Sequence, residues 1–90
     1  MKISYDEKKC QWTLVERGLD FEDAIKVFAG DYLEFADDRR DYGEDRYIVF
    51  GELDGRAVAI VWTPRRGTRR IISMRHVHDE EVEARRTAPD

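Results

Sequence analysis

Cysteine and long apolar runs are almost absent from this 90-residue chain. The single cysteine, Cys10, excludes an internal disulfide and cannot build a Cys-based zinc site. No apolar run approaches the ~18 residues that a membrane-spanning helix needs. The N-terminus lacks a positively charged region followed by an apolar stretch, so no signal peptide is expected. These absences predict a cytoplasmic protein without a membrane span.

Length and composition predict one small folded domain over residues 1–90. A chain of this size buries roughly 60–68% of its unfolded surface, which is enough for one thin core. Apolar residues make up 41% of the chain and charged residues 40%, so a folded core and a surface crowded with ions are both expected. No repeat, linker or low-complexity segment divides the chain.

The first third of the chain predicts a short strand and two helices. The strand is expected over Met1–Tyr5. Asp6 is a good N-cap for a helix over Glu7–Arg17, and Gly18 stands where the residue after a helix belongs. Asp20 caps a second helix, in which apolar residues follow the i, i+3, i+4, i+7 spacing. The apolar side of the first helix is expected to consist of Cys10 and Leu14, with Trp12 and Val15 as further candidates.

From residue 32 onward the apolar period changes to two, which predicts strands. Asp54-Gly55 is a hairpin signal that favours a type I′ turn, and Pro64–Gly67 is expected to break the central strand. A short helix is expected after Asp79. The order β-α-α-β-β-β-β-α predicts an α+β domain: an antiparallel sheet with the two N-terminal helices on one face and a short C-terminal helix. The predicted strands are Tyr32–Ala36, Arg46–Leu53, Ala57–Thr63 and Arg69–Arg75; the predicted core residues are Phe21, Ile25, Phe28, Ile48, Phe50, Val58, Ile60 and Ile72.

The stretch from Thr63 to His78 concentrates positive charge on an otherwise acidic chain. It holds five arginines, two histidines and no acid, although the whole chain has a formal net charge of −4. Residues 1–62 carry nine basic and fifteen acidic side chains, and residues 79–90 carry two and five. Such a gathering is typical of a surface that meets a localised anion, for example a phosphodiester backbone. The alternative is a solvated strand whose arginines pair with the surplus acids.

Regular alternation along the last strand predicts one polar face. Residues 69, 71, 73 and 75 are expected to share it, so that Arg69 and Arg75 contact phosphates of a nucleic-acid strand. Arg65 and Arg66 project from the preceding turn. Trp62, at the end of the neighbouring strand, is either a base-stacking platform for single-stranded RNA or a residue that fills the core.

Two further groups can serve either chemistry or structure. His76 and His78 can move a proton near neutral pH, as RNA cleavage through the 2′-OH requires, or can simply lie on the surface. No recognised metal-ligand spacing surrounds them. The segment Asp41–Arg46 offers a general base in Glu44 and an anion clamp in Arg46, or else forms a polar turn whose charges pair locally.

Four motifs follow one another along nearly the whole chain. Residues 5–9 read YDEKK, residues 18–24 read GLDFEDA, residues 37–46 read DDRRDYGEDR and residues 70–75 read RIISMR. In this order they resemble the W-D-x-x-K opening, the G-V-x-F-x-x-A segment, the D-x-R-x-D-Y-G-E-x-R turn and the R-I-I-S-A/M-R strand of the BrnT family. BrnT proteins are bacterial type II toxins, which are ribonucleases with a RelE-like fold.

The resemblance implies a metal-independent endoribonuclease without cofactors. Arginines and lysines would position the RNA and stabilise the charge that develops as the 2′-OH attacks the adjacent phosphorus. The implied partner is a BrnA-like antitoxin with a ribbon-helix-helix domain, through which alone the toxin would touch DNA. The expected roles are the scissile phosphate for Arg75, a flanking phosphate for Arg69, a proton for His76, and RNA binding for Lys9 and Glu44.

Several positions depart from the family pattern. The Asn and Lys-His that often precede the first glycine are here Thr13 and Glu16-Arg17, and the basic stretch after the last strand is here His76 followed by acids from Asp79 onward. These changes lower the positive potential near the expected RNA site. Three hypotheses stay open: an active endoribonuclease held in check by an antitoxin, a module of the same fold that binds antitoxin without catalysis, and a plain protein-interaction domain.

Overall fold

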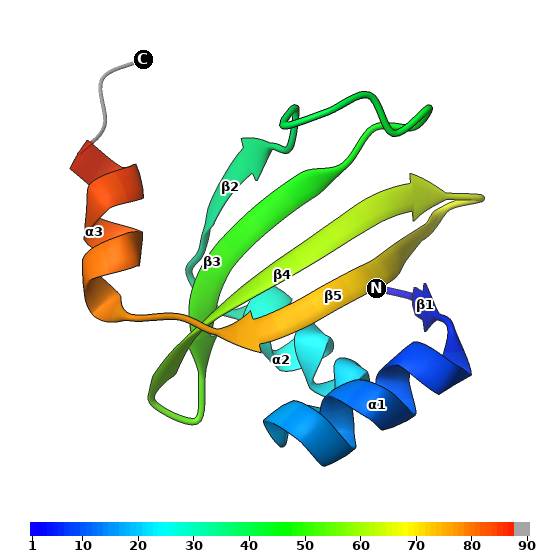
Figure 1. Cartoon of the computed structure of the whole chain (residues 1–90), viewed down its shortest axis with the longest axis horizontal. Helices are drawn as coiled ribbons and strands as arrows, with labels where there is room; N and C mark the ends of the chain where they lie inside the picture. Colours follow the sequence, from blue (N-terminus) through cyan, green and yellow to red (C-terminus); the bar gives the residue numbers. More distant parts are fainter. Residues whose placement is uncertain (88–90) are drawn as a thin grey trace.

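The protein folds around a five-stranded mixed sheet (Figure 1). The computed structural model describes residues 1–87. The domain expected over residues 1–90 thus has its last three residues, 88–90, outside the described part. The elements are β1 (Ile3–Tyr5), α1 (Glu7–Arg17), the 3-10 helix η1 (Phe21–Asp23), α2 (Ala24–Ala29), β2 (Leu33–Ala36), β3 (Tyr47–Leu53), β4 (Arg56–Arg65), β5 (Thr68–His76) and α3 (Asp79–Thr87). The strand order is β1-β5-β4-β3-β2, which makes β4 the central strand.

The sheet is not purely antiparallel. β1 runs parallel to β5 and pairs Ile3 with Arg69 and Tyr5 with Ile71, whereas the other three neighbouring pairs are antiparallel. The expectation of an antiparallel sheet is therefore wrong at this edge. Two strands that pair in parallel need a long connection between them. Here the connection consists of α1, η1, α2 and the three strands β2 to β4, after which β5 runs beside β1 in the same direction.

Helix α1 begins and ends at the predicted residues because both of its caps are local. The Asp6 side chain accepts a backbone N–H of the first turn at 2.9 Å. Gly18, with φ 69°, ends the helix in the left-handed region, where a glycine has no steric cost. The buried side of α1 differs from the prediction: Cys10 and Thr13 are buried, and Leu14 is 42% exposed. The expected burial of Leu14 is wrong.

The second helix starts as a 3-10 turn. Asp20 caps η1 by accepting the N–H of residue 22 at 2.9 Å, and α2 continues from it. The buried residues Phe21, Ala24 and Val27 recur every third position, so Ile25 lies on the outer side and is 41% exposed. The expected burial of Ile25 is wrong for this reason.

The core consists of two clusters separated by the sheet. The first joins α1, η1 and α2 to the sheet, and the second lies on the opposite face, where Val82 of α3 packs against it. Ile72 is only partly buried in the second cluster. No helix within residues 1–87 has the length and apolarity to cross a membrane. The first cluster comprises Cys10, Leu19, Phe21, Ala24, Val27, Phe28, Val49, Leu53, Val58, Ile60, Trp62, Ile71 and Met74; the second comprises Ile48, Phe50, Ala59 and Val61.

Two tight turns shape the hairpins on either side of β4. Asp54 and Gly55 both have positive φ, 51° and 81°, which confirms the type I′ turn. The predicted break over Pro64–Gly67 is confirmed in its second half: β4 runs on through Pro64 to Arg65, and the turn lies at residues 66 and 67, with φ 50° and 78°. β3 begins at Tyr47, opposite Trp62, and does not reach Pro64, so the missing N–H of Pro64 leaves no β3 carbonyl without its bond.

Candidate functional site

A β-bulge in β5 decides which side of the sheet each side chain faces. Val61 pairs with Ser73 and Trp62 pairs with Ile71, which leaves Ile72 as an additional residue in β5. One extra residue in a strand shifts the alternation of side chains by one position. The two halves of β5 therefore do not follow a single period of two.

The arginines of β5 are divided between the two faces by this bulge. Arg69 lies on the side of α1 and α2, whereas Arg70, Ser73 and Arg75 lie on the other side through their pairing with β4. We call this other side the arginine face. The expectation that Arg69 and Arg75 share a face is wrong, because regular alternation does not hold across Ile72.

Besides the packing of Val82, two polar contacts attach helix α3 to this side of the sheet. Arg75 Nη2 donates to Glu81 Oε1 at 2.8 Å, and Arg75 Nη1 donates to Glu81 Oε2 at 3.3 Å. The Arg85 guanidinium lies over the rings of Phe35 and Phe50, 5.3 and 5.7 Å from their centroids. Arg75 holds the pKa of Glu81 below its usual value mainly by this hydrogen bonding. Arg75, which was expected to bind a phosphate, is thus already paired with the carboxylate of Glu81.

Arg69 and Trp62 form a structural stack on the helix side. The Arg69 guanidinium lies 4.5 Å from the ring centroid of Phe28 and 4.6 Å from that of Trp62, and its Nη1 is buried. Trp62 is 8% exposed, and its Nε1 donates to Glu34 Oε2 at 3.0 Å. Of the two interpretations of Trp62, core filling is the one that this geometry fits, and Arg69 packs with it rather than facing solvent with Arg75.

The predicted residues Glu44 and Arg65 are brought together. Glu44 accepts from Arg46 Nε at 3.0 Å and from Arg65 Nη2 at 3.1 Å. These arginines, Arg46 first, lower the pKa of Glu44. Arg46 also lies 4.0 Å from the ring centroid of Tyr42. The local pairing expected as the structural alternative is present, while Arg66 stays exposed in its turn.

His76 is set apart from the other predicted residues. It pairs with Val58, whose side chain belongs to the helix-side cluster, so it faces away from Arg75. Its Nδ1 is buried without a hydrogen-bond partner. Burial, followed by the charge of Arg56, lowers the pKa of His76 below its ordinary 6.5. Because its side chain faces the opposite side of the sheet, His76 is not placed to assist Arg75. Within residues 1–87, no three His, Cys, Asp or Glu side chains are grouped to hold a metal ion.

Lys9 belongs to a groove that the sequence did not point to. The groove, about 320 Å³ in volume, lies between α1 and the edge of β5. Of the residues that line it, only Lys9 is among the candidate site residues predicted from the sequence. The i, i+4 spacing along α1 nevertheless places all of its helical residues on one stripe of the helix. Its lining consists of Lys8, Lys9, Trp12, Thr13, Arg17, Ile72 and Ser73.

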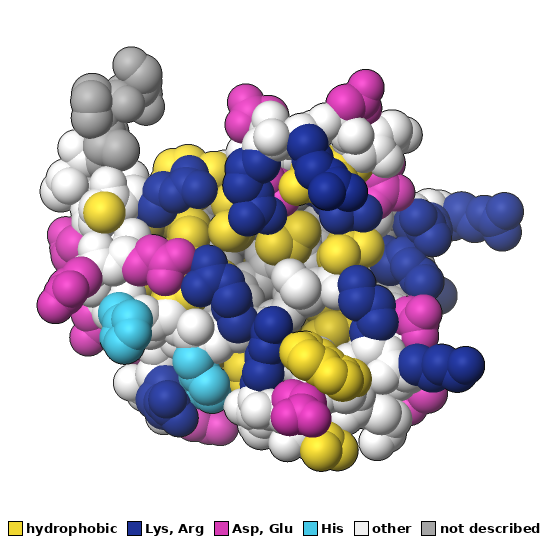
Figure 2. Space-filling view, in the orientation of Figure 1, with side chains coloured by type: hydrophobic (Ala, Val, Ile, Leu, Met, Phe, Trp, Pro, Cys, Tyr) yellow, Lys and Arg dark blue, Asp and Glu magenta, His cyan; other side chains and the backbone are white. Residues whose placement is uncertain are grey.

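The groove and the arginine face form one basic surface. Ser73 belongs to both, since it lines the groove and lies between Arg70 and Arg75 in the pairing with β4. Figure 2 views the molecule from the side away from α2 and shows lysine and arginine side chains gathered over the sheet and beside α1, with most acids toward the margins.

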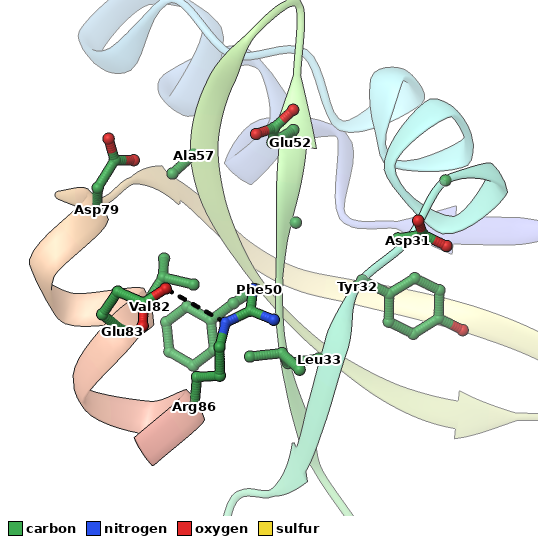
Figure 3. A pocket seen from close by; sticks show the side chains of 12 residues that line it. Asp31, Tyr32, Leu33, Phe50, Glu52, Ala57, Asp79, Val82, Glu83 and Arg86 are labelled. Atoms are coloured by element: carbon green, nitrogen blue, oxygen red, sulfur yellow. Dashed lines mark ion pairs between the residues drawn. The ribbon is translucent and has the colours of Figure 1, made fainter. Parts of the chain in front are cut away.

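A second cleft has the opposite charge. It occupies about 770 Å³ between α3 and the end of β2 and β3 (Figure 3). Asp31, Glu52, Asp79 and Glu83 contribute carboxylates to its lining, while Arg86 is its one basic residue. A cleft of this charge repels a polyanion, so the basic surface is the candidate site for one.

A family model for BrnT, the ribonuclease toxin of a type II toxin-antitoxin system, matches residues 5–81. The chain belongs to the BrnT family. BrnT membership implies a ribonuclease toxin and an antitoxin partner. The match begins at Tyr5, the last residue of β1, and ends at Glu81, so it includes α1, the strands β2 to β5 and the acid that pairs with Arg75. No curated protein matched the chain significantly.

Proposed function

We propose that this BrnT protein is an endoribonuclease that binds single-stranded RNA on the arginine face and needs no metal. The observation that supports the proposal is the arginine face itself: Arg70, Ser73 and Arg75 follow one another on the side of the sheet that α1 and α2 leave free. A flexible strand of RNA can lie along a β-strand that presents cations at intervals. The fold is proposed to be RelE-like, and the site of action the cytoplasm.

Arg75 takes the central role in the proposed reaction. The ribose 2′-OH attacks the adjacent phosphorus and gives its proton to solvent water, and negative charge develops on the phosphoryl oxygens as the bond to the leaving 5′-oxygen, which takes a proton from water, breaks. A guanidinium placed against these oxygens stabilises that charge with two hydrogen bonds in a fixed geometry. Arg70 is proposed to hold a flanking phosphate in place of Arg69, which packs on the helix side.

The proposed partner is an antitoxin with a ribbon-helix-helix domain, which would connect the toxin to DNA. We propose that an acidic segment of the antitoxin covers the arginine face and excludes RNA. Such a contact should weaken steeply as salt rises, because exposed charges are screened. Antitoxin affinity that stays constant from low to molar salt would instead indicate an apolar interface elsewhere.

The proposal is tested by Arg75→Ala. Loss of one charge-stabilising group costs roughly 10²–10³ in rate, so induction of the variant should no longer arrest growth, and the purified protein should no longer cleave RNA. The melting temperature should change little, since the Arg75 and Glu81 side chains are 41% and 40% exposed and such pairs add little stability. The control is Arg86→Ala, whose partner Glu83 lies on the same helix. A variant as toxic as the parent at equal expression would exclude Arg75 from the active site.

A second candidate function is a module that binds antitoxin but has lost catalysis. The bidentate contact of Glu81 with Arg75 favours it, because the carboxylate occupies the donors that a phosphate would need. Antitoxin-free protein that binds RNA and antitoxin but neither cleaves RNA nor arrests growth would establish this second function.

A further inference from the structure

The groove beside α1 combines an aromatic ring with cations. Trp12 is 53% exposed and lies in the groove, and the Arg17 guanidinium is 4.9 Å from the centroid of its ring. Lys8 and Lys9 stand one turn earlier on the same side of the helix. Among the residues that line the groove, none is acidic. An exposed tryptophan within a cationic rim is the combination that binds single-stranded nucleic acid.

The position of the groove is fixed by contacts between α1 and β5. Arg17 Nη1 donates to the carbonyl oxygen of Met74 at 2.9 Å, beyond the point where β1 stops pairing with β5. Thr13 is buried against the sheet and its hydroxyl donates to the carbonyl of Lys9 at 2.8 Å. The helix is thus held at the free edge of β5, and the Trp12 ring is presented at a defined place.

The groove continues the arginine face. Ser73 lines the groove and also lies between Arg70 and Arg75 on the sheet. An RNA strand whose phosphate contacts Arg75 can therefore extend across the edge of β5 and place a neighbouring nucleotide in the groove. Figure 2 shows the basic side chains passing from the sheet to α1 without an intervening band of acids.

We propose that this groove binds one nucleotide of the RNA, with its base stacked on Trp12 and its phosphate held by Lys8 and Lys9. The inference rests on the proposed function and adds a binding subsite next to the reacting phosphate. A volume of about 320 Å³ matches one small ligand unit rather than a folded protein element. The cationic rim selects a polyanion over an apolar peptide, which commits the groove to RNA.

Binding of a 2′-O-methyl RNA hexanucleotide, which cannot be cleaved through a 2′-OH, tests the subsite. Trp12→Ala should weaken binding roughly fivefold to a hundredfold, the range for one lost base stack. Val15→Ala is the matched control, since Val15 is on the same helix, 78% exposed and outside the groove. Because Trp12 and Trp62 are the only tryptophans and Trp62 is 8% exposed, RNA should quench the emission of the parent but not that of Trp12→Phe.

A set of hexanucleotides with one abasic position each identifies the stacked base. One abasic position should weaken binding to the parent but not to Trp12→Ala, because the two changes remove the same contact. If every abasic penalty is unchanged in Trp12→Ala while Arg75→Ala still weakens binding, the subsite is wrong and the proposed function stands. If Trp12→Ala weakens antitoxin binding but not RNA binding, the groove is a protein contact and the inference fails. Antitoxin-free parent that binds no RNA would overturn the proposed function and the subsite together.

Discussion

Arg75 and Glu81 form a bidentate ion pair that joins the arginine face to the C-terminal helix, with nitrogen to oxygen distances of 2.8 and 3.3 Å. Two parallel N–H donors to two carboxylate oxygens are the arrangement in which a guanidinium also binds a phosphate. If RNA binds at Arg75 as proposed, Glu81 must compete with it for the donors of Arg75. The C-terminal helix, whose Val82 and Arg85 pack against the sheet cluster, is held in place partly by Glu81.

Glu81→Gln should strengthen RNA binding. The substitution removes the negative charge that opposes a phosphate at Arg75, and exposed ion pairs are worth ~0.2–1 kcal/mol, so affinity should rise roughly 1.4-fold to fivefold. Glu83→Gln is the matched control, since it makes the same change in net charge on the same helix but its partner is Arg86. Fluorescence anisotropy with a non-cleavable oligonucleotide measures both. Equal gains in the two variants would mean that net charge alone acts.

Arg69 and Arg70, although adjacent, should have separate effects. Arg69→Ala removes a guanidinium packed between Phe28 and Trp62, so unfolding free energy should fall by about 1–2 kcal/mol. Arg70→Ala should leave stability unchanged and lower RNA affinity, with a smaller salt slope of the binding constant. Denaturant unfolding and binding titrations of both variants check this. If Arg69→Ala keeps full stability but loses RNA binding, the division of β5 between two faces is wrong.

The parts of the fold that sequence could predict are those that depend on neighbours in the chain. Asp6 and Gly18 define α1 because a cap needs only the first or last turn, and Asp54-Gly55 defines a hairpin because positive φ is a property of those residues. Pairing over long sequence separations is different. β1 is parallel to β5 because of the path that the chain takes between them. No local sequence pattern contains that path.

The candidate site was only partly predictable for the same reason. The positive charge of residues 63–78 is visible in the sequence, and it predicts that this stretch binds an anion. The bulge at Ile72 is not, because it exists only when β4 and β5 are in register. The groove was missed because Lys8, Trp12 and Arg17 become one site only when α1 rests on the edge of β5.

Gly51→Ala should destabilise the protein. A Cβ at this position would lie 2.7 Å from Val27 Cγ1 and 3.4 Å from Tyr32 Cβ. Val27 is buried and β-branched, so it cannot easily turn away, and overpacking of this kind costs roughly 1–3 kcal/mol. Gly30→Ala is the control, because the nearest atom to its Cβ is 3.8 Å away. Denaturant unfolding compares them; equal stability of the two variants would mean that α2 packs less closely on β3.

His76 should make stability depend on pH in a window that lies below the ordinary histidine pKa. Burial and the charge of Arg56 lower the folded pKa of His76 below 6.5, whereas the unfolded chain titrates near 6.5. Between these values the unfolded chain binds more protons, so the free energy of unfolding falls as pH drops below about 6.5 and levels off below the folded pKa. The pKa values of Asp37 and Glu81 are also lowered, but from 3.8 and 4.5, so their contribution is lost only at more acidic pH.

Removing the imidazole should remove this dependence. His76→Asn cannot be protonated in the window, so its unfolding free energy should change less between pH 7.5 and pH 5 than that of the parent. His78→Asn is the control for loss of a histidine, because His78 is exposed. Urea unfolding of all three proteins at several pH values decides the matter. A slope that disappears with His78→Asn and persists with His76→Asn would show that the buried Nδ1 of His76 does not control the titration.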